Sequence, residues 1–338
     1  MPIIEAHSLS KHYKRFRRRP GLGGAVKDLW HRKYEVVRAV DGIDLSVERG
    51  EIIGYIGPNG AGKSTTIKML TGILVPTAGT LAVQGLVPHK DRYRHVKTIG
   101  VVFGQRTQLW WDIAVIEAFN LLQKIYEIPM TDYRARLERF KQVLGLGDLL
   151  DIPVRKLSLG QRMRCDLAAS LLHNPRILFL DEPTIGLDVA VKAGIRDFIR
   201  EMNREQGTTV ILTTHDLSDI EELCSRVVMI DSGKLIYDGE LRALKETVDI
   251  PRRLLVETLF PIRPDKMLQL LQGFPMDVTA VDPYRWELGF SKSRVSLPQL
   301  MQLLLDTLEV RDLEIEEPAI EDIVRQIYDR RSAAGGRE

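Results

Sequence analysis

The chain has 338 residues, of which 44% are hydrophobic and 28% charged, and its net charge is only +2. This composition is that of a folded globular protein and excludes a disordered or collagen-like chain. No stretch approaches the roughly 18–20 consecutive apolar residues of a membrane span, so we do not expect the chain itself to form a translocation path. Its two cysteines, Cys165 and Cys224, have neither a metal-ligand spacing nor a disulfide framework, which indicates a reducing compartment.

Basic residues crowd the beginning of the chain, after a first strand that starts at Ile3. Residues 14–37 predict a basic insertion between the first two strands, with a short helix over 25–33. The lysines and arginines around it are Lys11, Lys14, Arg15, Arg17, Arg18, Arg19, Lys27, Arg32, Lys33 and Arg38. Such a segment is typical of contact with anionic lipid headgroups, at about 1 kcal/mol per basic residue near the surface. Docking on the loops of a membrane protein and a solvated charged loop are the alternatives.

A glycine-rich loop, G-P-N-G-A-G-K-S-T, follows the apolar run 51–56 and precedes a helix-like segment. It matches G-x-x-x-x-G-K-[ST], the pattern of a phosphate-binding loop. Glycines let the backbone close around an anion, and amides of the loop and the helix N-terminus then point at phosphate oxygens. Lys63 is expected to reach the β- and γ-phosphates, and the Ser64 hydroxyl to hold Mg²⁺. The residues expected to line the nucleotide are Gly57, Asn59, Gly60, Gly62, Lys63, Ser64 and Thr65.

Two later apolar runs end in residues suited to phosphate chemistry. Residues 177–180 are continuously apolar, as a strand buried on both faces requires, and Asp181 and Glu182 follow at the strand end that faces the ligand crevice. We expect Asp181 to orient Mg²⁺ through its water shell and Glu182 to polarise the attacking water, unless Glu182 is only a solvated acid. His215 ends the run 210–214, where a donor stabilises a γ-phosphate.

Between these strands, residues 113–128 and 133–144 predict helices. Trp110 and Trp111 stand at the entrance to this region, either as part of a docking groove or as core residues. Residues 195–202 place apolar side chains on one helix face, and 227–237 predict a hairpin that closes the first domain.

Taken together, these motifs resemble the ATP-binding cassette (ABC) family over about residues 3–240. The run L-S-L-G-Q, residues 157–161, is similar to the family signature L-S-G-G-Q, with Leu159 where glycine is usual. The resemblance implies that Ser158, Gly160 and Gln161 contact the ATP held by a second protomer. It also implies a helical subdomain over about 106–170 within an α/β cassette of the P-loop NTPase fold.

Three further assignments follow from the same resemblance. Gln105, in F-G-Q, matches the loop that touches Mg²⁺ and the water and reports to the membrane partner. Asp188, in G-L-D, matches the loop that crosses the dimer interface. Tyr13 resembles the aromatic residue that stacks on adenine, with Phe16 and Tyr34 as nearby alternatives.

Within the family, residues 103–112 and the C-terminal appendage most resemble the ATPase subunits of ABC-2-type exporters. The implied cofactors are ATP and Mg²⁺. The implied partners are integral membrane permease subunits and a second ATPase protomer, at the cytoplasmic face of the membrane, with no nucleic acid. A soluble ABC ATPase of translation or DNA repair is the alternative function, and a non-catalytic binding module is a third.

The sequence predicts a boundary between a cassette, residues 1–245, and a small second domain, residues 246–338. Strand-like and helix-like segments follow one another there as β-α-β-β-α-β, which favours an α+β domain of ferredoxin-like type, and a last helix starts near Pro318. No catalytic constellation is visible in it. We expect a role in dimerisation or regulation, or else stabilisation of the cassette.

Overall fold

The computed structural model describes residues 2–16, 34–104 and 106–335. The chain divides into two compact units, Met1–Leu241 and Arg242–Glu338, so the boundary falls slightly before the expected one. Gln105 and the helix expected over residues 25–33 lie outside the described residues. Within the described ranges, no helix has both the length and the apolar character needed to cross a membrane.

The first unit is built on a six-stranded sheet in the order β5-β6-β7-β3-β8-β9. Its strands are β3 (Ile52–Ile56), β5 (Ile99–Phe103), β6 (Ile177–Asp181), β7 (Thr209–Thr213), β8 (Arg226–Asp231) and β9 (Lys234–Glu240). Pairing is parallel from β5 to β8, and the predicted hairpin β8–β9 is antiparallel. The parallel strands are buried on both faces, which explains their continuous apolar runs. Asp181 pairs with Phe103 on one side and Thr213 on the other, so three strands end together.

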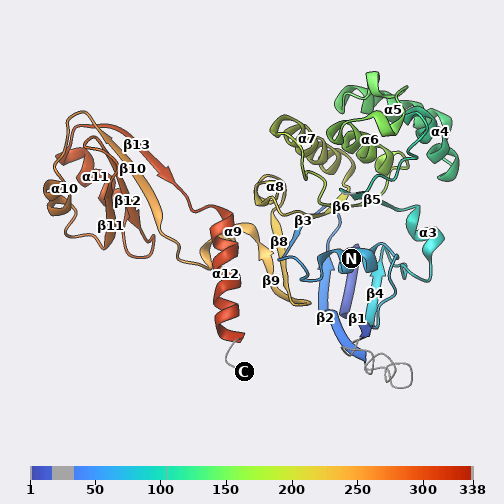
Figure 1. Cartoon of the computed structure of the whole chain (residues 1–338), viewed down its shortest axis with the longest axis horizontal. Helices are drawn as coiled ribbons and strands as arrows, with labels where there is room; N and C mark the ends of the chain where they lie inside the picture. Colours follow the sequence, from blue (N-terminus) through green and yellow to red (C-terminus); the bar gives the residue numbers. More distant parts are fainter. Residues whose placement is uncertain (1, 17–33, 105, 336–338) are drawn as a thin grey trace, which may run out of the picture. The chain divides into compact units, whose positions relative to one another are not determined.

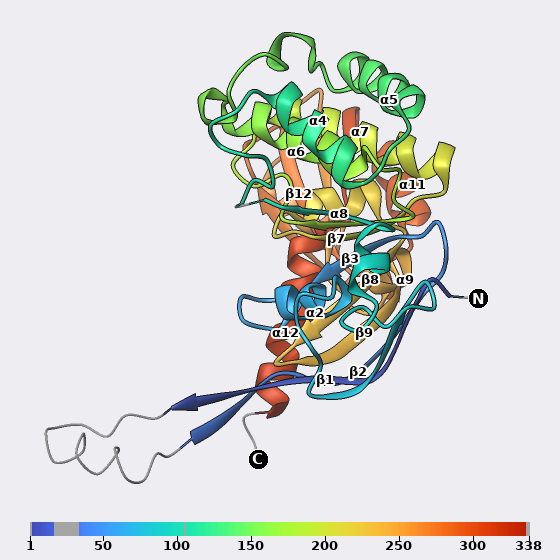
Figure 2. The same ribbon diagram turned by 90° about the vertical axis from the view of Figure 1, so that its right-hand side faces the viewer.

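The first strands do not join this largely parallel sheet. β1 (Ile4–Phe16), β2 (Tyr34–Val47) and β4 (Ala78–Val83) form a separate antiparallel sheet in the order β2-β1-β4. Apolar side chains of both sheets, among them Leu9 and Phe179, share one core. Cross-strand pairing continues to Phe16 and Tyr34, so residues 14–16 and 34–37 of the expected basic insertion belong to β1 and β2, and residues 17–33 lie outside the described residues. Figure 2 shows β1 and β2 leaving the rest of the unit as a two-stranded ribbon.

Helices fill the connections of the first unit. α2 (Lys63–Leu70) follows β3, α3 (Arg92–Val96) precedes β5, and α7 (Val189–Gln206) and α8 (Leu217–Leu223) flank β7. The segment between β5 and β6 is helical, as predicted, with α4 (Val115–Ile125), α5 (Met130–Val143), two short 3₁₀ turns (Gly147–Leu149 and Val154–Lys156) and α6 (Leu159–Leu171). Figure 1 shows α4, α5 and α6 grouped together beyond β5 and β6.

The second unit begins around α9 (Leu241–Glu246) and has the predicted element order β-α-β-β-α-β. Its elements are β10 (Arg252–Thr258), α10 (Pro264–Leu270), β11 (Met276–Ala280), β12 (Arg285–Phe290), α11 (Leu297–Thr307), β13 (Val310–Glu316) and the final α12 (Ile320–Gly335). The antiparallel sheet has the order β11-β12-β10-β13, a split β-α-β arrangement. Trp286, Leu288 and Phe290 alternate along β12 and form its core with residues of α10 and α11 such as Met267 and Leu300.

Candidate active site

The phosphate-binding loop lies where the sequence predicts it, between β3 and α2. Gly62 is the N-cap of α2 and has a φ of 113°, a conformation that residues with a Cβ rarely adopt. A Cβ at Gly62 would also lie 2.4 Å from the Ala39 carbonyl oxygen. Strand β2 therefore passes directly behind the loop, and the first-turn amides of α2 are left to bind an anion. Lys63, Ser64 and Thr65 form that first turn, and Gly57, Asn59 and Gly60 lie in the loop before it.

The Lys63 side chain is folded along its own loop. It is 7% exposed, and its Nζ donates hydrogen bonds to the carbonyl oxygens of Gly57 at 2.5 Å and Pro58 at 3.1 Å. Burial lowers the pKa of Lys63, and the nearby carboxylates of Glu182 and Asp181 oppose that shift. Because an ionised phosphate oxygen attracts the Lys63 ammonium more strongly than a neutral carbonyl oxygen does, a phosphate can replace these loop partners.

Two side chains beside the loop carry oxygen atoms that are suitable ligands for a magnesium ion. Asp181, the last residue of β6, accepts a hydrogen bond from the Thr213 hydroxyl of β7, which holds its carboxylate at the strand end. The Ser64 hydroxyl lies exposed in the first turn of α2. Carboxylate and hydroxyl oxygens, completed by water and phosphate oxygens, are the ligands that Mg²⁺ prefers.

Glu182 and His215 form a pair at the ends of β6 and β7. The Glu182 Oε1 and His215 Nε2 atoms are 2.8 Å apart, with the side chains 19% and 45% exposed. The pair is therefore partly open to solvent, and the imidazole ring and the carboxylate orient each other. Together with Lys63 and Asp181, they give the phosphate loop a charged end suited to positioning water against a phosphate.

The backbone at Glu182 is held in an unusual conformation. Its φ is 56°, in the left-handed region, where a residue with a long side chain is uncommon. Its amide donates to the Thr213 carbonyl at 2.8 Å, and Gly104 packs against its carbonyl so closely that a Cβ at Gly104 would lie 1.9 Å from that oxygen. The Gly104 amide in turn donates to the Asp181 carbonyl at 2.7 Å. These contacts on both sides keep Glu182 strained and aim its side chain.

A buried carboxylate that the sequence analysis missed is hydrogen-bonded to the segments next to Glu182 and His215. Asp219 of α8 is 0% exposed and accepts hydrogen bonds from the hydroxyls of Thr184, at 2.5 Å, and Thr214, at 3.5 Å. It also forms an ion pair with Arg196 of α7 at 3.3 Å. Thr184 follows Glu182 closely and Thr214 precedes His215, so one carboxylate ties both segments. The signal in the sequence was a second acid one turn after the helix-capping Asp216.

The signature residues Ser158 and Gln161 bind each other at the start of α6. The Ser158 hydroxyl accepts from the Gln161 amide at 3.2 Å, and the Gln161 Oε1 accepts from the Ser158 amide at 2.9 Å. This is a capping box, visible in the sequence as S-x-x-Q but not noticed there. Gly160 lies in the same first turn, near Val191. Leu159, which departs from the usual signature, lies against Gly186, where a Cβ would be 3.0 Å from it.

The structure shows fewer contacts for the remaining predicted residues. Tyr13 pairs across β1 and β2 with Val37, close to the Ala39 that backs the phosphate loop, and its ring is 39% exposed under the Lys11 Nζ at 5.4 Å. The alternatives Phe16 and Tyr34 lie farther along the ribbon, with ring centroids 6.1 Å apart. Asp188 caps α7, since its carboxylate accepts from the Val191 amide at 2.9 Å. Gln105 lies outside the described residues.

Trp110 and Trp111 are surface residues, 42% and 50% exposed, so the alternative that they belong to the core is wrong. The guanidinium of Arg162, from α6, lies 5.7 Å from the Trp111 ring centroid. The Trp111 ring therefore lies beside α6, and both rings are accessible to a partner.

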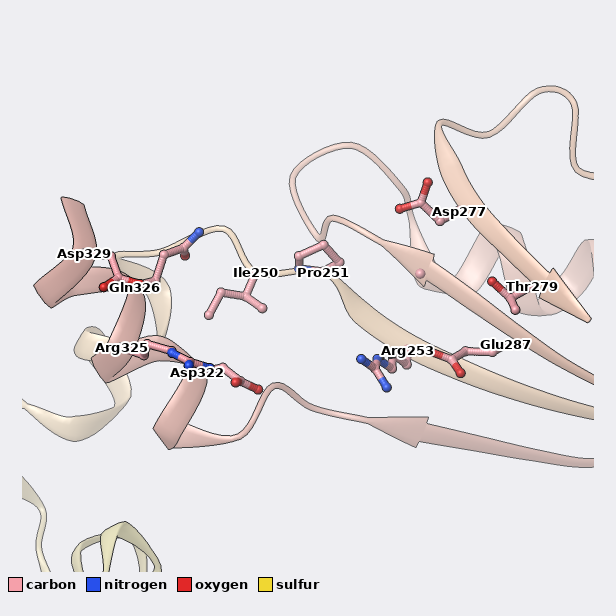
Figure 3. Close-up of a pocket in the computed structure, with 11 residues that line it drawn as sticks. Ile250, Pro251, Arg253, Asp277, Thr279, Glu287, Asp322, Arg325, Gln326 and Asp329 are labelled. Carbon is pink, nitrogen blue, oxygen red and sulfur yellow. Dashed lines mark ion pairs between the residues drawn. The ribbon is translucent and has the colours of Figure 1, made fainter. Parts of the chain in front are cut away.

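The second unit contains a cavity of about 510 Å³. Figure 3 shows side chains from the sheet and from α12 facing it. The labelled residues include Arg253, Asp277, Thr279, Glu287, Asp322, Arg325, Gln326 and Asp329. Arg253 and Glu287 form an ion pair at 3.1 Å across neighbouring strands. Side chains of both charge signs line this cavity.

Comparisons with known proteins identify the family of this chain. The profile of the family described as ABC transporter matches residues 40–185, which include the phosphate loop, the signature and Glu182. The daunorubicin/doxorubicin resistance ATP-binding protein of Streptomyces peucetius is 32% identical over 294 residues, covering 86% of this chain and 88% of that protein. A methionine import ATP-binding protein of Enterococcus faecalis is 34% identical over 220 residues, 64% of each chain.

The fold also matches solved structures. A dimeric ATP-binding cassette, bound to ADP and Pi in a post-hydrolysis state, aligns with a TM-score of 0.59 and 24% identity over 71% of this chain and 99% of that one. The likeness shows the fold of a P-loop ATPase cassette. The chain belongs to the ABC transporter family, as one of its ATP-binding and ATP-hydrolysing subunits.

Proposed function

We propose that the chain is the ATPase subunit of an ABC-2-type exporter and works as a pair of protomers that share two ATP molecules. The observation that carries the catalytic part is the pair of Glu182 and His215, 2.8 Å apart, beside the buried Lys63 of the phosphate loop. The observation that favours a shared site is Ser158, which caps α6 at the surface, where a second protomer can bring ATP to it.

The proposed reaction divides its tasks among residues of this chain. Lys63 and the first-turn amides of α2 hold the β- and γ-phosphates. Ser64 and Asp181 would hold Mg²⁺, with Gln105 also assigned to it, and the ion would supply positive charge to the phosphates. Glu182 orients the attacking water, and His215 holds Glu182 at one nitrogen and is itself 45% exposed.

The proposed partners follow from surfaces of the first unit. Trp110 and Trp111 offer an exposed apolar surface to a permease subunit, which would place the chain peripherally at the cytoplasmic face of the membrane. The basic insertion is proposed to meet anionic lipid headgroups. The second unit, residues 246–338 in the sequence analysis, is proposed as a ferredoxin-like regulatory or dimerisation domain. Among the described residues between Lys63 and Asp181 the helices are short and form no long coiled coil, which speaks against the DNA-repair alternative.

Replacing Glu182 by glutamine tests the catalytic assignment. Glu182→Gln keeps the size of the side chain but removes the carboxylate that polarises water, a contribution of about 10²–10⁴-fold. We expect ATP turnover of the purified chain to fall by that factor while nucleotide affinity is kept. ATP should then hold the variant as a dimer in size-exclusion chromatography.

The matched control is Glu222→Gln, at an exposed acid of α8 that pairs with Arg200 on the surface. It should keep wild-type turnover. Normal turnover in Glu182→Gln would overturn the catalytic role given to Glu182.

A further inference from the structure

The loop that follows β5 is hydrogen-bonded at both ends to different parts of the site. Before the loop, the Gly104 amide donates to the Asp181 carbonyl of β6 at 2.7 Å. After Gln105, the Arg106 amide donates to the Phe103 carbonyl at 2.9 Å. The continuation, residues 106–109, leads away from the sheet toward α6, the helix that Ser158 caps.

Residues of this segment donate hydrogen bonds to Asp166, in the middle of α6. Asp166 is only 4% exposed, and its Oδ1 accepts hydrogen bonds from the Thr107 hydroxyl at 2.8 Å and the Gln108 amide at 3.0 Å. The Gln108 side-chain amide donates to the Asp166 carbonyl oxygen at 2.8 Å, so the loop is bound to the helix backbone as well. The Leu109 amide also faces the carboxylate and donates to the Thr107 hydroxyl at 3.1 Å.

Packing alone does not hold this loop. A cavity of about 230 Å³ lies beside it, bounded by Val101, Val102 and Phe103 of β5 and by Arg106, Thr107, Gln108 and Asp166. Because part of the loop borders this cavity rather than packed side chains, its hydrogen bonds contribute to fixing its position. The bonds to Asp166 are therefore the connection between the loop and α6.

We propose that Asp166 is a positioning residue for ATP hydrolysis, which fixes the Ser158 end of α6 relative to the Asp181 end of β6 through residues 106–109. Ser158 lies about 12 Å along the helix axis from Asp166, close enough for a rigid helix to carry the constraint. The proposal rests on the proposed function, because Ser158 matters for turnover only if it meets ATP. It adds a link between the two halves of the site that no sequence motif contains.

The charge on Asp166 costs stability, which argues for a role other than folding. Burial raises the pKa of Asp166 to about 6. Hydrogen bonds from Thr107, Gln108 and Leu109, and the positive charge of Arg162 on the same helix, act in the opposite direction and lower this pKa. Arg106 faces the same cavity from the loop, Cys165 adjoins on α6, and the β5 residues around the cavity carry no charge. Since the folded-state pKa lies above the ordinary value, the fold is favoured by protonation and loses that contribution as pH rises through about 6. A neutral residue would therefore be tolerated better at pH 7.5.

The test is Asp166→Asn in the full-length chain. Asparagine keeps the shape, and its oxygen can still accept from Thr107 and Gln108, but its amide group would meet the Leu109 amide. We expect ATP turnover to fall roughly tenfold at pH 7.5, as for the loss of one charge-assisted hydrogen bond. ATP affinity should be unchanged and the melting temperature equal to or above that of the wild type. The ratio of wild-type to variant turnover should shrink toward one as pH falls from about 7.5 to 5.5, where Asp166 itself becomes neutral.

Two controls make the outcome decisive. Ser170→Ala removes a buried hydroxyl of the same helix that bonds only within it, to the Leu167 carbonyl at 2.7 Å, and should leave turnover unchanged. On the loop side, Thr107→Val should slow turnover like Asp166→Asn, and Thr107→Ser should restore it. If Asp166→Asn does not fold, the Thr107 pair decides, and equal turnover in both Thr107 variants overturns the proposal.

The proposal is also overturned if Asp166→Asn hydrolyses ATP at the wild-type rate, or if Ser170→Ala is equally slow. Glu182→Gln, assayed in parallel, distinguishes failure of the role proposed for Asp166 from failure of the proposed function. If Glu182→Gln is inactive while Asp166→Asn is normal, only the positioning role is lost. If Glu182→Gln is active, the assigned chemistry itself is wrong.

Discussion

Asp219 and Asp197 lie in two ion pairs with arginines of α7 that differ in burial. Asp219 is 0% exposed and faces Arg196 at 3.3 Å, whereas Asp197 is 74% exposed and faces Arg200 at 2.8 Å. A shorter distance does not make the surface pair more important, because water screens it and an exposed pair contributes about 0–1 kcal/mol. Removing one partner of a buried pair leaves an uncompensated charge inside the protein.

We therefore expect Asp219→Asn to destabilise the first unit by about 3 kcal/mol, and Asp197→Asn to change its stability by less than about 0.5 kcal/mol. Thermal denaturation followed by circular dichroism measures both. The two threonines that Asp219 holds also flank the catalytic pair, so ATP turnover should fall in Asp219→Asn even below its melting temperature. Equal melting temperatures of the two variants would contradict the importance given to burial.

At the scale of elements, the ribbon of β1 and β2 separates what the sequence can predict from what it cannot. Apolar runs and turn residues predict β3, β6 and β7, since a strand buried on both faces has to be apolar. The ends of β1 and β2 are mostly exposed, so no buried apolar pattern marks them as strands, and the sequence alone assigns them to the insertion.

The candidate site divides in the same way. Lys63, Asp181, Glu182 and His215 could be predicted because each stands at a strand or helix end with a recognisable pattern. Asp166 could not, because its partner Gln108 is 58 positions away, and only the folded chain brings the two together. The strain at Glu182 was also invisible, since it comes from contacts with neighbouring strands rather than from the local sequence.

The lipid contact proposed for the basic insertion can be tested at this scale. Replacing Arg15, Arg17, Arg18 and Arg19 together by glutamine should weaken binding to vesicles containing phosphatidylserine by at least about tenfold at low salt. The difference should shrink at high salt, which screens surface charge. ATP turnover in solution should be unchanged. Vesicle co-sedimentation measures the binding.

A matched variant controls for net charge. It replaces four exposed basic residues of the second unit, Arg263, Lys266, Lys292 and Arg294, by glutamine. If both variants lose vesicle binding equally, the insertion is only one part of a general charge effect. Unchanged binding of the first variant at low salt would show a solvated loop.

For the whole molecule, the structure groups the predicted residues into two sets within one unit. Lys63, Asp181, Glu182 and His215 surround the phosphate loop, and Ser158 and Gln161 satisfy each other at the start of α6. A hydroxyl that accepts one bond still has a proton to donate, so the Ser158 cap can be kept while it binds a phosphate. A shared site then needs no rearrangement of α6 at its first turn.

Mixing two inactive variants tests whether each ATP site is built from two chains. Lys63→Ala damages the phosphate loop, and Ser158→Arg places a bulky cation where the signature would meet phosphate. In a mixed dimer, one site collects both defects and the other is intact. ATP-driven dimerisation, and part of the turnover if one site suffices, should reappear on mixing.

Because Ser158 also caps α6, its replacement costs about 1 kcal/mol of stability, and the melting temperature of Ser158→Arg should be checked first. If mixed dimers are shown to form and remain as inactive as their parents in both assays, the shared site is in doubt. Self-contained sites, or strict coupling between the two, would then be favoured.

The left-handed backbone at Glu182 has a consequence for how this chain can evolve. A φ of 56° suits glycine or asparagine better than glutamate, so the residue assigned to the chemistry makes the fold less stable, by about 1 kcal/mol. Selection for thermal stability alone would replace it, and only selection for hydrolysis retains it. In a lineage that no longer needs to hydrolyse ATP, mutation of this position would be favoured rather than neutral. Return of the glutamate would lower stability again, so the residue would be retained only where the regained hydrolysis outweighs that cost.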